Sequence, residues 1–138
     1  MNRILVVDDA ATVRMYHRKI LGDAGWHIEE ACNGVEALER VHAQDEGSAF
    51  DLYVVDVNMP RMDGYSFVRA LRQLDDRHQA PVVMVSTEAQ RHDTRSAFEA
   101  GANGYVVKPA RPPDLLLNAA LLLGDRAVAL KAAAEVRA

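Results

Sequence analysis

Short strand-like runs and helix-like segments alternate about five times along the chain, and this alternation restricts the folds that it can adopt. The runs cover residues 3–7, 27–31, 52–56, 82–85 and 104–107, of which 27–31 has the weakest pattern. The apolar residues of these runs are mostly continuous, which is typical of strands buried on both faces of a sheet. The connections between them are too long for hairpins. The sequence therefore predicts one α/β domain in which helices cover both faces of a parallel sheet.

The segments between the runs carry apolar residues at helical spacing. Helices are expected over about 13–24, 34–43, 64–74 and 90–100, and again from Pro113 onward. Asp63 is expected to cap the third helix, and Gly101 to end the fourth. In that fourth helix, Ala97 and Phe98 are expected to face the core.

Composition excludes several classes of protein. The chain has 138 residues with 49% hydrophobic and 26% charged residues, values that are typical of a folded globular domain. A net charge of -4 disfavours broad binding to nucleic-acid phosphates. The single cysteine, Cys32, excludes an internal disulfide framework. No run reaches membrane-spanning length and the N-terminus has no signal-peptide pattern, so no membrane association and a cytoplasmic location are expected.

Four of the five runs end in, or are followed directly by, polar residues. These residues are Asp8 and Asp9, then Asp56, Ser86 and Lys108. The carboxyl ends of parallel strands share one edge of a sheet, and neighbouring strands are only about 5 Å apart. Three carboxylates there would repel each other, whereas a divalent cation such as Mg²⁺ would relieve the conflict. A carboxylate can itself act as a nucleophile, so the pattern indicates metal-assisted phosphoryl transfer onto Asp56.

Ordinary structural roles are the alternative for each of these residues. Asp8-Asp9 and Ser86-Thr87 can simply cap the helices that follow them. Lys108 can be a surface lysine, as most lysines are. Asp56 is the hardest to explain in this way, because a helix cap does not require a buried strand before it. If each residue had only a structural role, their occurrence together on one edge of the sheet would be a coincidence, so we favour the functional interpretation.

Four motifs in order resemble the receiver domain of two-component response regulators, most of all its stand-alone, CheY-like members. They are DD after the first run, DVNMPRMDG around the third, VSTEA after the fourth and YVVKP at the fifth. The resemblance extends from about Arg3 to Leu123, and it is specific because all four motifs occur in the family's order. It implies a doubly wound, flavodoxin-like five-stranded parallel sheet with strand order 2-1-3-4-5.

The resemblance also implies the residues of a phosphorylation site. Asp56 would be the phosphoacceptor and one ligand of Mg²⁺ or Mn²⁺. Asp9 would bind the metal directly and Asp8 largely through water. The backbone carbonyl of Asn58 would complete the protein's share of the metal sphere.

The same resemblance implies a switch beside that site. Lys108 would pair with the phosphoryl group, and its peptide bond to Pro109 is expected to be cis. Ser86, where the family more often has threonine, would be the switch hydroxyl, and Tyr105 the aromatic that follows it. Thr87 stands where the family usually has alanine or glycine, and its bulk is expected to narrow the approach of water.

The function that follows is a phosphorylation-dependent response regulator rather than an enzyme, with only self-phosphorylation and slow autodephosphorylation as chemistry. A sensor histidine kinase or a histidine phosphotransfer protein would supply the phosphoryl group. The target would be a protein, such as a flagellar motor component or another kinase. Alternatives are a phosphorelay intermediate, a phosphate sink, or a receiver excised from a longer regulator.

An enzyme on the same fold is disfavoured. A flavodoxin would have a phosphate-binding loop rich in glycine and hydroxyl groups after the first strand, where the negative charge of Asp8-Asp9 is unsuitable. A haloacid-dehalogenase-type phosphatase would have a second aspartate where Asn58 stands.

The C-terminal part has more apolar surface than one docked helix requires. We expect a receiver domain over 1–124 and a C-terminal helical extension of its last helix over 125–138. Leu117 and Leu121 lie outside the face that would dock on the sheet. The tail is expected to extend the last helix or fold back over it, and the alternative is a protein-docking or homodimer surface. A monomer or a weak homodimer is therefore expected.

Overall fold

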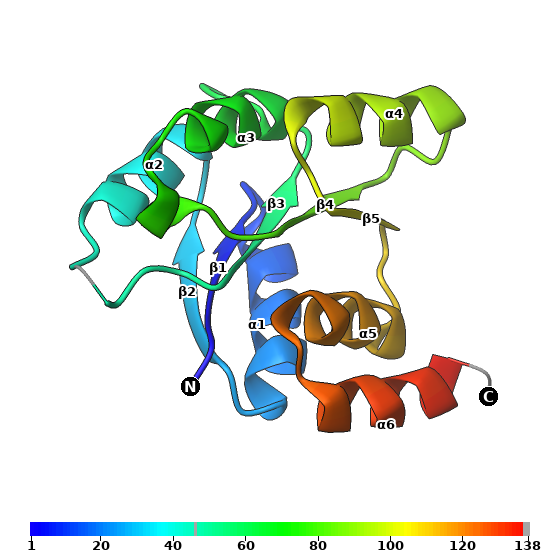
Figure 1. The fold of residues 1–138 in the computed structure, drawn as a ribbon. Helices are drawn as coiled ribbons and strands as arrows, with labels where there is room; N and C mark the ends of the chain where they lie inside the picture. Colours follow the sequence, from blue (N-terminus) through cyan, green and yellow to red (C-terminus); the bar gives the residue numbers. More distant parts are fainter. Residues whose placement is uncertain (46, 137–138) are drawn as a thin grey trace.

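A five-stranded parallel sheet lies at the centre of the molecule (Figure 1). The structure is a computed structural model that describes residues 1–45 and 47–136. The strands are β1 (Arg3–Val7), β2 (His27–Ala31), β3 (Leu52–Asp56), β4 (Val82–Ser86) and β5 (Gly104–Val107). Their order in the sheet is β2-β1-β3-β4-β5. The predicted fold class and strand order are therefore confirmed.

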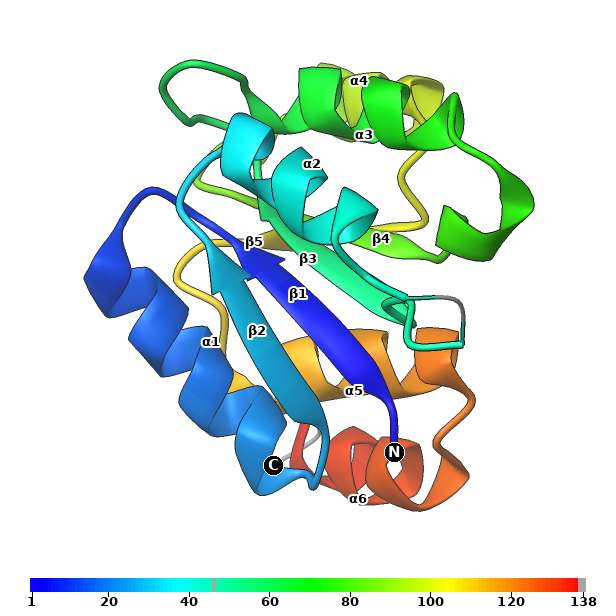
Figure 2. The ribbon, with the colours of Figure 1, turned by 90° about the vertical axis from the view of Figure 1, so that its left-hand side faces the viewer.

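Helices cover both faces of the sheet (Figures 1 and 2). Helices α2, α3 and α4 lie on one face, α1 and α5 on the other, and α6 lies outside α5. A 3₁₀ turn at Asp76–His78 precedes β4. Within the described ranges, no helix has the length and apolar character needed to cross a bilayer. The helix bounds are α1 (Ala11–Asp23), α2 (Gly34–His42), α3 (Gly64–Arg72), α4 (Arg91–Ala100), α5 (Pro112–Leu123) and α6 (Arg126–Val136).

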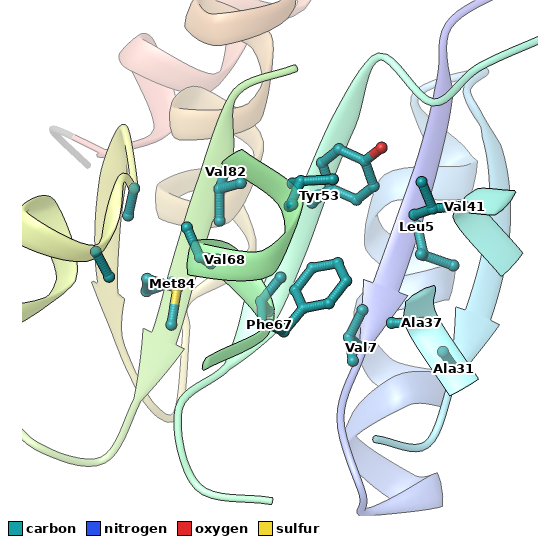
Figure 3. Close-up of a cluster of buried hydrophobic side chains, with 14 of the residues drawn as sticks. Leu5, Val7, Ala31, Ala37, Val41, Tyr53, Phe67, Val68, Val82 and Met84 are labelled. Carbon is teal, nitrogen blue, oxygen red and sulfur yellow. The ribbon is translucent and has the colours of Figure 1, made fainter. Parts of the chain in front are cut away.

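Alternation along each strand divides the core into two clusters. In β1, Leu5 and Val7 point toward α2 and α3, whereas Ile4 and Val6 point toward α1 and α5. Figure 3 shows the first cluster, in which Phe67 of α3 lies among side chains of β1, β3 and β4. Because both faces are buried, the strands have the continuous apolar sequence that predicted them.

The helix ends follow local sequence signals, with one error in the predicted core. The side chain of Asp63 accepts a hydrogen bond from the Ser66 amide at 2.8 Å, which confirms it as the cap of α3. Gly101 ends α4 in the left-handed conformation, with φ 115°. Ala97 is fully buried as predicted, but Phe98 is 48% exposed. Only a narrow strip of α4 packs on the sheet, and Phe98 lies one residue, or about 100°, away from it.

The chain turns back after α5. Gly124 has φ 73°, and two residues separate the end of α5 from the start of α6, which runs back beside it. The Asp125 side chain accepts hydrogen bonds from the Val128 amide at 3.2 Å and from the Trp26 indole at 3.1 Å. This connection holds α6 against the outer side of α5, where Leu117 is partly covered.

Candidate functional site

Three carboxylates meet at the carboxyl edge of the sheet. Asp8 and Asp9 follow β1, and Asp56 ends the neighbouring strand β3, in which Val55 pairs with Val7 of β1. One oxygen atom from each of the three carboxylates lies within 4.8 Å of the others. Asp8 and Asp56 are only 1% and 6% exposed, whereas Asp9 is exposed. The structure thus brings together the three acidic residues that the sequence singled out.

Lys108 reaches this cluster from the end of β5. Its Nζ donates hydrogen bonds to Asp8 Oδ2 at 2.7 Å and to Asp56 Oδ1 at 3.1 Å. Burial alone would lower the pKa of Lys108, but the bonds to the two carboxylates outweigh burial and raise its pKa. Burial raises the pKa of Asp56, and the neighbouring Asp8 charge adds to that effect against the opposing Lys108. The site is therefore an acidic cluster that one lysine only partly neutralises.

The donor set suits a divalent cation. All three side chains offer carboxylate oxygens, which are the ligands that Mg²⁺ and Mn²⁺ accept in proteins. The exposed Asp9 leaves one side of the cluster open to water, and Mg²⁺ usually keeps several water ligands. Asn58 is exposed just beyond β3, and the metal role of its backbone carbonyl stays a prediction.

The predicted switch residues share one loop residue. Ser86 is fully buried, and its Oγ accepts a hydrogen bond from the Glu88 amide at 3.1 Å. The hydroxyl of the half-buried Tyr105 donates to the Glu88 carbonyl at 2.7 Å. A movement of Ser86 would therefore disturb the residue that holds Tyr105. Thr87 lies between Ser86 and Glu88 in the sequence, and its side chain is exposed.

The ordinary roles considered above do not account for these residues. The cap of α4 is Gln90, which forms a capping box with Asp93, so Ser86 and Thr87 do not cap that helix. Helix α1 begins without a side-chain cap, and Asp8 Oδ1 instead accepts a hydrogen bond from the Ala10 amide at 2.9 Å. The Lys108 side chain is only 15% exposed. The Lys108–Pro109 peptide bond is cis, as expected.

Sequence reasoning missed the structural importance of two residues at the site. Gly64 was expected only to begin a helix, yet a Cβ on it would lie 2.2 Å from the backbone oxygen of Asp56. His17 is 2% exposed, and burial lowers its pKa. It lines an apolar cavity of about 460 Å³ together with Thr87 and Lys108. Its signal was present in the sequence, because it lies four residues after Val13 on the buried face of α1.

Comparison with known proteins gives a consistent result. The family model of the response regulator receiver domain matches residues 4–120. The chemotaxis protein CheY of Pseudomonas aeruginosa is 42% identical over 108 residues, which are 78% of this chain and 84% of that protein. CheY-3 of Vibrio cholerae is 38% identical over the same length, 78% of this chain and 80% of its own.

Solved structures agree with the sequence comparison. Chemotaxis protein CheY4 of Vibrio cholerae superposes with a TM-score of 0.80 at 34% identity, covering 88% of this chain and 98% of that one. A putative response regulator from Chloroflexus aurantiacus gives a TM-score of 0.82 at 30% identity, covering 89% and 98%.

Proposed function

The chain belongs to the response regulator receiver domain family, and we propose that it works as a switch that accepts a phosphoryl group on Asp56. Receiver domains are signalling domains of two-component systems rather than conventional enzymes. One observation carries the assignment of the acceptor. Asp8 and Asp56 are both buried and both accept a hydrogen bond from Lys108, but the other oxygen of Asp8 is held by the Ala10 amide, whereas within the described residues Asp56 accepts a hydrogen bond through Oδ1 alone.

Transfer requires little chemistry from the protein beyond position and charge. A carboxylate oxygen of Asp56 forms the new bond to phosphorus as the bond to the donor's histidine nitrogen breaks. When bound by Asp8, Asp9 and Asp56, with the carbonyl of Asn58, Mg²⁺ or Mn²⁺ supplies positive charge that offsets the carboxylates and the phosphoryl oxygens. Lys108 already donates to Asp56, so its ammonium group is available to pair with a phosphoryl oxygen.

Switching would begin at Ser86. A phosphoryl oxygen on Asp56 offers the Ser86 hydroxyl a strong acceptor. Movement of Ser86 toward it would give up the hydrogen bond from the Glu88 amide and disturb the loop that holds Tyr105. The surface formed by α4, β5 and α5 would then change its affinity for a partner. Phosphorylation thus shifts the equilibrium between two arrangements of the loop that contains Ser86 and Glu88.

The partners follow from the same proposal. The donor is a sensor histidine kinase or a histidine phosphotransfer protein, and the output is a protein contact. Because two relatives are named chemotaxis proteins, the target proposed first is a flagellar motor component, and another kinase is the alternative. A phosphorelay intermediate or a phosphate sink would use the same site. Either role requires that phosphate leaves Asp56 quickly, whereas a regulator that binds a target requires that phosphate stays on Asp56.

Incubation with a small acyl phosphodonor tests the proposal. With Mg²⁺ present, we expect each chain to take up one phosphate that survives acid and is lost in base, as measured by intact mass. Chelation of the metal by EDTA is expected to reduce uptake to background, because the carboxylate cluster would then repel the donor's phosphate. Two results would contradict an aspartyl phosphate: no phosphate uptake in the presence of Mg²⁺, or a bound phosphate that survives both acid and base.

Loss of the phosphate should depend on Thr87. A Thr87→Ala variant is expected to lose phosphate severalfold faster, because removal of the side chain opens the approach for water. Decay of the phosphorylated protein, followed by mass after the donor is removed, measures this rate. Thr12→Ala is the matched control, since Thr12 is an exposed threonine on the same cavity but lies on α1. Equal decay of wild type and Thr87→Ala would refute the shielding role.

A further inference from the structure

Helix α6 lies outside the part of the chain that the receiver family shares, because the family model ends at residue 120. It runs back beside α5 and buries Ala129 and Ala132 (Figure 1). The opposite side of α6 carries an apolar strip, beside which the charged Lys131 and Glu135 are exposed. Leu130 is 61% exposed on it, with Ala127 and Ala134 also in solvent. The molecule therefore carries an uncovered apolar face on its C-terminal helix.

That face continues a stripe that begins on α5. Leucine recurs at every seventh position, and alanine recurs at every seventh position with an offset of four. The two series are Leu116, Leu123, Leu130 and Ala120, Ala127, Ala134. Two series with this spacing form one seam of a helix, as in a coiled coil, only when the helix is continuous. The observed turn at Gly124 instead divides the seam between α5 and α6.

The two halves of the seam have different surroundings in the folded-back arrangement. The α5 half forms part of the contact with α6: Ala120 is fully buried, and Leu116 is half-buried. The α6 half is largely exposed: Leu130 lies at the edge of the cavity between α5 and α6 and is 61% exposed. The exposed α6 residues thus belong to the same sequence pattern as the α5 residues that already form an interface with α6. This is the pattern expected if a second copy of the chain can cover the whole seam.

The fold-back is an extensive contact made largely through small side chains. Helix α6 packs through the small side chains of Ala129 and Ala132. Cavities of about 380 Å³ and 430 Å³ lie on either side of it, the first between α1, α5 and α6 and the second between α5 and α6. The turn depends on the left-handed conformation of Gly124 and on the two hydrogen bonds that Asp125 accepts. Opening gives up this contact, and in the open state the second copy would cover Leu116 and Ala120 in place of α6.

We infer that α5 and α6 form a two-state element. In the state described above, α6 covers α5 of its own chain. In the other state, Gly124 becomes helical, residues 112–136 form one helix, and the Leu/Ala seam packs against the same seam of a second copy. Protein concentration selects between the two states, because only the open state can pair. The two states are inferred from α5 and α6 alone and require no phosphoryl group on Asp56.

Sedimentation equilibrium of three variants tests the inference. Gly124→Ala is expected to tighten self-association at least about tenfold, because alanine is strained in the left-handed conformation and favours a continuous helix. Adding Leu130→Glu to that variant should return it to a monomer by placing a charge in the seam. The matched control adds Leu121→Glu instead. Leu121 is 65% exposed but lies off the seam, so that variant should still dimerise.

Tryptophan fluorescence provides a second measurement. Trp26 is the chain's only tryptophan, and its indole bonds to Asp125 in the closed state. Its emission is expected to change as concentration rises in Gly124→Ala and to stay constant once Leu130→Glu is added. A Gly124→Ala protein that stays monomeric at high concentration overturns the inference. So does dimerisation that Leu121→Glu abolishes and Leu130→Glu does not, because the interface would then lie elsewhere.

Discussion

An Asp56→Asn variant is expected to take up no base-labile phosphate from an acyl phosphodonor while remaining folded. The amide has no nucleophilic oxygen anion, and no other carboxylate of the cluster takes its place. Asp8 is bound by Lys108 and by the Ala10 amide, and Asp9 faces solvent. Intact mass measures the loss. The matched control is Asp51→Asn, just before β3 and outside the cluster, where the carboxylate accepts a hydrogen bond from the Arg3 amide at 2.8 Å, so uptake should stay at the wild-type level.

The same variant should also be more stable than wild type when metal is chelated. Burial raises the pKa of Asp56, so the folded protein favours the protonated carboxyl more than the unfolded chain does. The ionised form therefore costs stability above the unfolded pKa, and asparagine removes that cost. Urea unfolding at several pH values measures the effect. The gain should be largest near neutral pH and shrink as pH falls toward about 4, where the wild-type carboxyl is protonated.

Loss of function with a gain in stability is the combination expected of a functional residue. Phosphate uptake by Asp56→Asn equal to that of wild type would remove Asp56 as the acceptor. An Asp56→Asn protein that is less stable than wild type at neutral pH would instead show that the carboxylate is a structural element. The pairing with Lys108 would then outweigh burial and the repulsion from Asp8.

Gly64→Ala is expected to destabilise the fold by about 3 kcal/mol or more, a large effect for one methyl group. A Cβ at this position would lie 2.2 Å from the Asp56 backbone oxygen and 2.9 Å from Met84 Cε. The backbone cannot easily retreat, because the Gly64 amide donates to the Val57 carbonyl at 2.9 Å. Urea unfolding measures the loss, and reduced phosphate uptake should accompany it because Asp56 itself must move.

Gly22→Ala is the matched control for that substitution. Gly22 lies inside α1, and a Cβ on it would meet only Ile28 Cγ1, at 3.9 Å. Alanine there should stabilise the protein by about 0.5–1 kcal/mol, since glycine is unfavourable within a helix. If Gly64→Ala is tolerated as well as Gly22→Ala, the close approach of α3 to Asp56 is not a constraint on the fold.

Much of the architecture was predictable because its signals are local. The apolar runs predicted the strands, since burial on both faces requires continuous apolar residues. Asp63 and Gly101 marked helix ends through hydrogen bonds and dihedral angles that involve only a few residues. The placement of Asp8, Asp9 and Asp56 on one edge also follows from pattern alone, because parallel strands present their carboxyl ends together.

Other features depend on contacts between distant residues. The run at 27–31 contains Glu29 and Glu30, and it becomes strand β2 by pairing with β1, while Arg14 and Arg18 form ion pairs with Glu30. Phe98 fits the helical apolar pattern but is 48% exposed, because the width of the strip buried under α4 depends on how that helix packs on the sheet. No local signal determines either outcome.

The sequence by itself determined the elements, their class and the residue types at the end of each strand. The tertiary structure decided which of these residues touch. It placed Lys108 2.7 Å from Asp8, a residue 100 positions away, and it attached Ser86 and Tyr105 to the same Glu88. It also folded α6 back at Gly124, although the Leu/Ala spacing by itself suits a straight helix. The physical reason is the distance along the chain over which each interaction acts. Helix propensities and caps depend on a few neighbouring residues, whereas the site depends on packing contacts between residues that lie far apart in the sequence.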